Sequence, residues 1–177
     1  MEIYLIDCEY LNSLEIDLLE KYKKKEIKDL YKKKVHCFAY FALEKILQNE
    51  YSIYEPKIIF KKNKPYLLNS EKYFSITHSG KYIGIAISDY DCGVDVEIIK
   101  KRNFQKIAKR LGFICNSLED FYQNWTHYES KYKLGVLEAS CKTYYLNQLV
   151  ITASSENVEE HFELVVQNVS DFSNLLI

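Results

Sequence analysis

The strongest constraint on this chain is a short run in which acids alternate with branched apolar residues. Residues 93–97 read Gly-Val-Asp-Val-Glu, which predicts a strand entered through a glycine turn. Successive side chains of a strand point to opposite faces, so Asp95 and Glu97 share one face. An isolated Asp-x-Glu is more often a solvated pair on an edge strand, because acids are mostly surface residues. A function for this pair therefore depends on what packs against it.

A helix about thirty residues later offers a complement to that strand. Residues 125–133 predict a helix on which Trp125, Glu129 and Lys133 are spaced by four and share a face. Glu129 and Lys133 alone would be an ordinary helix pair worth ~0.3 kcal/mol. Trp125, one turn earlier, favours burial of this face, and a buried carboxylate requires a partner or a metal.

Packing of the helix on the strand would bring three carboxylates and a lysine together. Mg²⁺ takes a few carboxylate oxygens and keeps positions for water and substrate phosphate. A lysine beside such an ion suits a phosphate oxygen. The pattern predicts a magnesium site with Asp95, Glu97 and Glu129 as ligands and Lys133 next to it.

Two shorter motifs come earlier in the chain. Lys64-Pro65 is followed by Ile-Thr-His-Ser-Gly at residues 76–80. Each of the four motifs is weak by itself, but together they occur in a fixed order across roughly residues 60–135. In these segments the chain resembles the 4′-phosphopantetheinyl transferases of the surfactin-synthetase-activator type.

The resemblance implies an α+β fold. Members of that family consist of two similar halves with pseudo-twofold symmetry, each a small antiparallel sheet packed with helices, and the active site lies at the junction. In this chain residues 1–90 would form the half that binds coenzyme A, and residues 91–177 the half that binds the metal. Two halves in one chain imply a monomer.

The resemblance also implies an activity. The family transfers 4′-phosphopantetheine from coenzyme A to a serine of an apo acyl or peptidyl carrier protein, and releases adenosine 3′,5′-bisphosphate. Mg²⁺ would be held by Asp95, Glu97 and Glu129. Glu129, or a water that it orients, would take the serine proton. Lys133 would stabilise charge on the phosphate, so catalysis would rest on Asp95, Glu129 and Lys133.

Residues of the first half would bind coenzyme A. By the resemblance, Lys64 and Pro65 contact the coenzyme. Thr77 replaces the family's usual serine and keeps its hydroxyl, and His78 would contact a coenzyme phosphate.

A lysine-rich run at residues 21–34 supplies further candidates. Such a run is usually a solvated helix face. The family has basic residues at a comparable place that contact the adenosine 3′-phosphate, which makes Lys32, Lys33 and Lys34 candidates without a choice among them.

Two positions depart from the family pattern. Tyr128 stands where the family commonly has a lysine before the helix glutamate, and a tyrosine offers only a neutral O–H donor. Asn63 stands where a glycine often precedes the lysine of the Lys-Pro pair, and asparagine can also adopt positive φ. We therefore expect weak coenzyme binding that Tyr128→Lys would tighten.

Composition narrows the classes of function. The 177 residues are 47% apolar and 15% aromatic, enough for the core of one domain or two small fused halves. A net charge of −1 gives no global reason to expect nucleic acid or an anionic membrane as partner. Five scattered cysteines without a C-x-x-C pair argue against a zinc or redox motif. The sequence shows no basic leader and no long apolar run, and together with the cysteine pattern this predicts a cytoplasmic protein.

Two other interpretations remain. A relative that binds coenzyme A or a carrier protein without turnover would keep the same motifs. A small nucleic-acid-binding protein using the lysine-rich run is less favoured, because the chain has no Gly-flanked basic aromatic motif.

Periodicity and turn residues predict the order of the elements. Strands are expected at residues 2–8, 57–60, 73–77, 82–88, 93–97, 144–152 and 161–167, with a turn at 61–65. Helices are expected from near Ser13, over 33–48, over 103–111 up to Gly112, and from an N-cap at Ser117 through residue 133.

Overall fold

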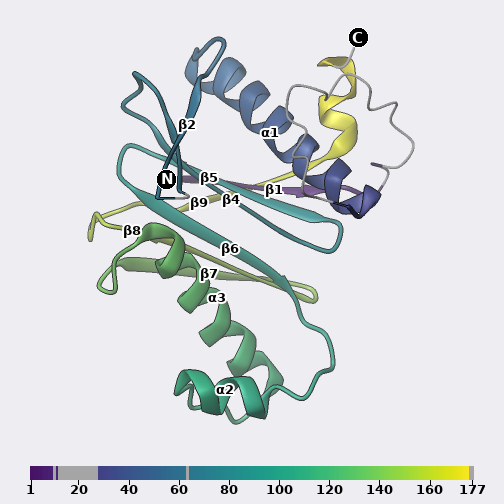
Figure 1. The fold of residues 1–177 in the computed structure, drawn as a ribbon, viewed down its shortest axis with the longest axis vertical. Helices are drawn as coiled ribbons and strands as arrows, with labels where there is room; N and C mark the ends of the chain where they lie inside the picture. The colour runs from purple at the N-terminus through teal and green to yellow at the C-terminus, as the bar shows by residue number, and fades with distance from the viewer. Residues whose placement is uncertain (10, 12–27, 63, 176–177) are drawn as a thin grey trace.

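A computed structural model describes residues 1–9, 11, 28–62 and 64–175. In these residues the protein is a mixed α+β fold of small sheets and three α-helices (Figure 1). The helix expected near Ser13, most of the lysine-rich run and the φ angle of Asn63 lie outside the described residues. No helix in the described part of the chain is long and apolar enough to cross a membrane.

The first sheet has four strands in the order β4-β5-β1-β9. They are β1 (Glu2–Asp7), β4 (Tyr73–Ser79), β5 (Tyr82–Ser88) and β9 (Glu163–Asn168). β5 is antiparallel to both of its neighbours, whereas β9 runs parallel to β1. The expectation of purely antiparallel sheets is therefore wrong at this edge, because the chain crosses from the second half back to its first strand.

The second sheet is antiparallel, in the order β6-β8-β7. Its strands are β6 (Cys92–Ile98), β7 (Ser140–Leu146) and β8 (Leu149–Ser155). The single strand expected over 144–152 is wrong, since the chain reverses there in a hairpin. Asn147 has φ +52°, the left-handed conformation that asparagine tolerates in tight turns.

A separate two-stranded ribbon joins β2 (Ile58–Lys61) to β3 (Lys64–Leu67). Lys61 pairs with Lys64 across the ladder, so the turn is shorter than expected and the Lys64-Pro65 motif lies in a strand. Pro65 is tolerated there because both strands of the ribbon are edges.

The helices begin and end on local signals. α1 (Leu30–Tyr51) starts at Asp29, whose side chain accepts from the Lys32 backbone N–H. α2 (Gln105–Leu111) ends at Gly112 in a left-handed conformation, as expected. α3 (Leu118–Leu134) starts at the predicted Ser117 cap, which forms a capping box with Asp120. A 3₁₀ helix, η3 (Val169–Leu175), follows β9 and was not expected.

Alternating side chains divide the interior into three cores. On β1, Tyr4 and Ile6 face the core beneath α1, whereas Ile3 and Leu5 face the core shared with the second sheet. A third core lies between the second sheet and the α2–α3 pair (Figure 1). On β6, Val94 and Val96 belong to the core that the two sheets share. The alternate residues of β6, including both acids, therefore face α3.

Candidate functional site

The site begins where β6 and α3 approach at Gly93. A Cβ at this position would lie 1.9 Å from the backbone oxygen of Ser130 and 2.9 Å from the backbone nitrogen of Leu134. The turn role expected for Gly93 is wrong, because the residue pairs with Ser154 inside the sheet. A glycine is required because the backbone of the helix lies against the strand, which sets the acid-bearing face of α3 close to that of β6.

Asp95 is the most deeply buried acid of the site, with 5% of the residue exposed. Its Oδ1 accepts from Thr77 Oγ1 at 2.9 Å and from Lys133 Nζ at 2.7 Å. Lys133 also donates to the Val94 backbone oxygen at 3.0 Å. Burial raises the pKa of Asp95, and the Lys133 charge and the Thr77 bond oppose that rise. Its Oδ2 is buried and accepts no hydrogen bond from the described residues.

Glu97 lies two residues further along the same face. Ser79 Oγ donates to its Oε2 at 2.7 Å, and Trp125 Nε1 donates to its Oε1 at 3.2 Å. Burial raises the pKa of Glu97, the Ser79 bond lowers it, and the charge of Asp95 raises it again. Both oxygens of this carboxylate are therefore held by neutral donors.

Glu129 approaches the same region from α3. Burial, then the charge of Asp95 and that of Glu97, raise its pKa, while Lys133 lowers it. The charges of Asp95, Glu97 and Lys133 all act on Glu129, so the structure brings the three predicted metal ligands and Lys133 into one region. Among the residues that the structure describes, however, no three His, Cys, Asp or Glu side chains already form a group that could hold a metal ion.

The donor set nevertheless fits a hard divalent cation. Asp95 Oδ2 is a buried acceptor without a hydrogen bond in the described structure, so its lone pairs are available to a cation. The Lys133 ammonium supplies one positive charge on the other oxygen. Lys133 acts on Asp95 and Glu129, and Arg102 acts on Glu97, while the three carboxylates supply oxygen atoms of the kind that Mg²⁺ prefers. Asp95, Glu97 and Glu129 are the residues that would hold it.

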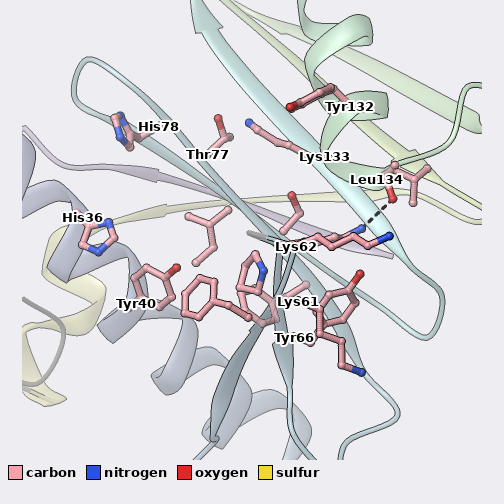
Figure 2. A pocket seen from close by; sticks show the side chains of 17 residues that line it. His36, Tyr40, Lys61, Lys62, Tyr66, Thr77, His78, Tyr132, Lys133 and Leu134 are labelled. Carbon is pink, nitrogen blue, oxygen red and sulfur yellow. Dashed lines mark hydrogen bonds between the residues drawn. The ribbon is translucent and has the colours of Figure 1, made fainter. Parts of the chain in front are cut away.

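A groove of about 840 Å³ lies next to the acids, between α1, the β2–β3 ribbon, β4 and the end of α3. Its basic lining residues are four lysines and two histidines: Lys61, Lys62, Lys64, Lys133, His36 and His78. No acidic residue lines it in the described part of the chain. In Figure 2, Thr77 and Lys133 lie side by side at one edge of the groove. The groove is therefore suited to an anion.

Aromatic rings form much of the remaining lining: Tyr40, Phe60, Tyr66, Phe74 and Tyr132. The ammonium groups of Lys61 and Lys64 lie 5.5 and 5.7 Å from the centre of the Tyr66 ring. Lysines and rings in one groove fit a ligand that carries both phosphates and a planar base.

The predicted coenzyme-binding residues divide into two sets. Lys64, Pro65, Thr77 and His78 line the groove, and so does Lys133 of the predicted catalytic set. The predicted lysines of α1 do not line it: Lys32, Lys33 and Lys34. Lys32 still acts at a distance on His78. Partial desolvation of the ring, then the charges of Lys133 and Lys32, lower the pKa of His78, although the residue as a whole is exposed.

Lys64 already has partners within the protein. Its Nζ donates to Asp91 Oδ1 at 2.5 Å and to the Leu134 backbone oxygen at 2.9 Å, the bond drawn in Figure 2. Leu134 is the last residue of α3, where a cation compensates the negative end of the helix. Lys64 thus joins β3 to the helix that carries Glu129 and Lys133.

Lys64→Gln is expected to lower the free energy of unfolding by about 1 kcal/mol, because a partly buried ion pair and a helix-end contact are lost together. Denaturant unfolding measures the change. Lys72→Gln is the matched control, since Lys72 pairs with the exposed Asp89 at 2.6 Å. Equal losses in the two variants would contradict a joining role for Lys64.

Sequence reasoning missed the α1 side of the groove. His36 and Tyr40 lie one helical turn apart, and their ring centroids are 5.0 Å from each other. The signal was an i, i+4 pair of rings on a helix whose apolar positions had been assigned to the core. Lys61 and Lys62 were also missed as lining residues. The signal in the sequence is that they belong to a basic run at residues 61–64, directly before Pro65 of the Lys64-Pro65 motif.

Tyr128 belongs to a row of aromatic rings on α3. Its ring centroid lies 5.9 Å from Phe113, 6.3 Å from Trp125 and 6.4 Å from Tyr132. Tyr128 does not line the groove. The tightening expected from Tyr128→Lys is therefore opposed by loss of this packing.

No protein-family model matches the chain, and a search of curated proteins finds no similar sequence. The functional conclusion therefore depends on the chemistry of the groove and of the acids beside it.

Proposed function

We propose that the protein is a 4′-phosphopantetheinyl transferase of the surfactin-synthetase-activator type, acting on coenzyme A and an apo acyl or peptidyl carrier protein. The observation that carries the proposal is Lys133, which lines the basic groove and also binds Asp95 in the acid cluster. Coenzyme A has a pyrophosphate, a 3′-phosphate and an adenine. The lysines of the groove complement the phosphates, and its aromatic rings complement the adenine. The adjoining acids would hold the Mg²⁺ and accept the serine proton that the transfer releases.

The reaction assigns one task to each region. The serine oxygen of the carrier attacks the phosphorus that bears pantetheine, and the bond from that phosphorus to the bridging oxygen breaks. Adenosine 3′,5′-bisphosphate leaves with the electron pair. Mg²⁺, when bound, neutralises charge on the pyrophosphate oxygens.

The residues of the chain would position and neutralise the reacting groups. Glu129, or a water that it orients, would accept the serine proton. Lys133, between the groove and Asp95, would donate to a phosphate oxygen. Thr77 would keep Asp95 oriented through its 2.9 Å bond.

The fold supports a division into two halves. Each of the two larger sheets carries a helix on its outer face, α1 on the first and α3 on the second (Figure 1). Residues 1–90 would form one half and 91–177 the other, with β9 and η3 returning to the first sheet, and the protein would act as a monomer. Sedimentation that shows an obligate trimer would contradict this arrangement.

The proposed activity is tested by incubating the protein with coenzyme A, Mg²⁺ and a panel of apo carrier proteins. A carrier mass increased by one phosphopantetheine group is expected, and excess chelator should prevent it. Calorimetric binding of coenzyme A without transfer to any carrier would instead support a non-catalytic relative. Absence of both would reject the proposal.

Coenzyme binding is expected to take up protons in mildly acidic solution. Desolvation and the neighbouring charges of Lys133 and Lys32 hold the pKa of His78 below its ordinary value, and a bound phosphate offsets those charges and raises it. Affinity therefore rises as the pH falls through the pKa of the bound form, and levels off below that of the free form.

Calorimetry in two buffers of different ionisation enthalpy measures this uptake. His78→Gln should remove it, and His161→Gln should keep it, because His161 does not line the groove. Uptake that persists in His78→Gln would show that another group titrates.

A further inference from the structure

Strand β4 presents a hydroxyl at every second position toward β6: Ser75, Thr77 and Ser79. Two of these hydroxyls donate to the acids of β6. We propose that Ser79 is a positioning residue that fixes the Glu97 carboxylate for a divalent cation. The inference rests on the proposed function in one respect, since it takes Glu97 to be a ligand of that cation.

The direction of the Ser79 bond is determined by its second partner. Ser79 Oγ accepts from the Ile98 backbone N–H at 3.2 Å and lies 2.7 Å from Glu97 Oε2. A backbone N–H can only donate, so the Ser79 proton is free to point to the carboxylate. The Ser79 hydroxyl is therefore bound to β6 twice. It accepts from the backbone of Ile98, the residue after Glu97, and it donates to the carboxylate of Glu97.

Trp125 holds the other oxygen of the same carboxylate. Its indole N–H, which is a donor only, lies 3.2 Å from Glu97 Oε1. Each oxygen of Glu97 therefore accepts one bond and retains a lone pair for a cation. A carboxylate that is held on both oxygens loses little side-chain conformational freedom when it binds a metal. Hydrogen bonds to a metal-binding carboxylate increase metal affinity for this reason.

The other two acids are held differently. Asp95 accepts from Thr77 and Lys133 on one oxygen only, and the described residues donate no hydrogen bond to Glu129. Ser75 supplies an internal comparison. Its hydroxyl accepts from the Val94 backbone N–H at 3.1 Å, as Ser79 does from Ile98, but no hydrogen bond joins it to a carboxylate of the described residues.

Terbium luminescence provides a readout that requires neither coenzyme A nor a carrier. Trp125 is the single tryptophan of the chain and donates to Glu97, so its excitation should sensitise Tb³⁺ bound at the acids. Ser79→Ala is expected to weaken Tb³⁺ affinity by about 10-fold, the usual effect of removing such a partner. Ser79→Thr, which keeps the hydroxyl, should restore the affinity, and Ser75→Ala should leave it within about 2-fold of wild type.

Three outcomes would overturn the proposal. They are wild-type affinity in Ser79→Ala, an equal loss in Ser75→Ala, and absence of sensitised emission from the wild-type protein. Near-ultraviolet circular dichroism on the same samples shows that each variant is folded. A wild type that binds Tb³⁺ tightly, with Ser79→Ala weakened, but transfers no phosphopantetheine would support the positioning role and reject only the transferase.

Discussion

Asp95→Asn is expected to lower the rate of phosphopantetheine transfer by more than about 100-fold, because loss of an outer partner of a metal ligand alone costs 10- to 100-fold. The substitution removes the charge and one oxygen of the acid whose Oδ2 is buried without a hydrogen bond in the described structure. Initial rates at saturating coenzyme A and Mg²⁺ measure the effect.

The same variant should remain folded, with a free energy of unfolding lowered by about 1–3 kcal/mol, because its amide N–H group would replace the buried Oδ2 without an acceptor. The amide oxygen can still accept from Thr77 and Lys133. Burial raises the pKa of Asp95, so the charge that the variant lacks is one that folding disfavours. Asp89→Asn, in the exposed pair with Lys72, is the control that should transfer normally. Normal transfer by Asp95→Asn would remove Asp95 from the site.

Gly93→Ala is expected to lower the free energy of unfolding by about 3 kcal/mol. The added carbon would lie 1.9 Å from the Ser130 backbone oxygen, and neither strand nor helix backbone can yield as a side chain does. The clash can be relieved only if α3 moves away from β6. That movement would separate Glu129 and Lys133 from Asp95, so any variant protein that folds should also lose transfer activity.

Gly112→Ala separates this clash from ordinary glycine effects. Gly112 has φ +73° and nothing within 4 Å of an added Cβ, so its substitution should cost about 1 kcal/mol, through backbone strain alone. Denaturant unfolding of both variants provides the comparison. A loss in Gly93→Ala no larger than that in Gly112→Ala would show that the close approach of β6 and α3 is not needed.

Local signals in the sequence were sufficient for part of the site. Alternation placed Asp95 and Glu97 on one face, and the capping box at Ser117 set the start of α3. These features depend on residues close in sequence. Spacing by four along the helix then placed Glu129 and Lys133 toward that face.

Features that depend on distant partners could not be predicted. Nothing near Lys64 indicates that Asp91 and the end of α3 accept its hydrogen bonds. The parallel pairing of β9 with β1 joins the two ends of the chain. The hairpin within residues 144–152 was missed because its turn, at Asn147, interrupts a continuous run of strand-forming residues.

The intact mass of an apo carrier protein after incubation with this protein, coenzyme A and Mg²⁺ tests the central claim most directly. The predicted result is a gain of one phosphopantetheine on a single serine, with an equal amount of adenosine 3′,5′-bisphosphate released, and no gain with Asp95→Asn. An unchanged mass for every carrier in the panel, with no coenzyme A bound in the groove, would contradict it.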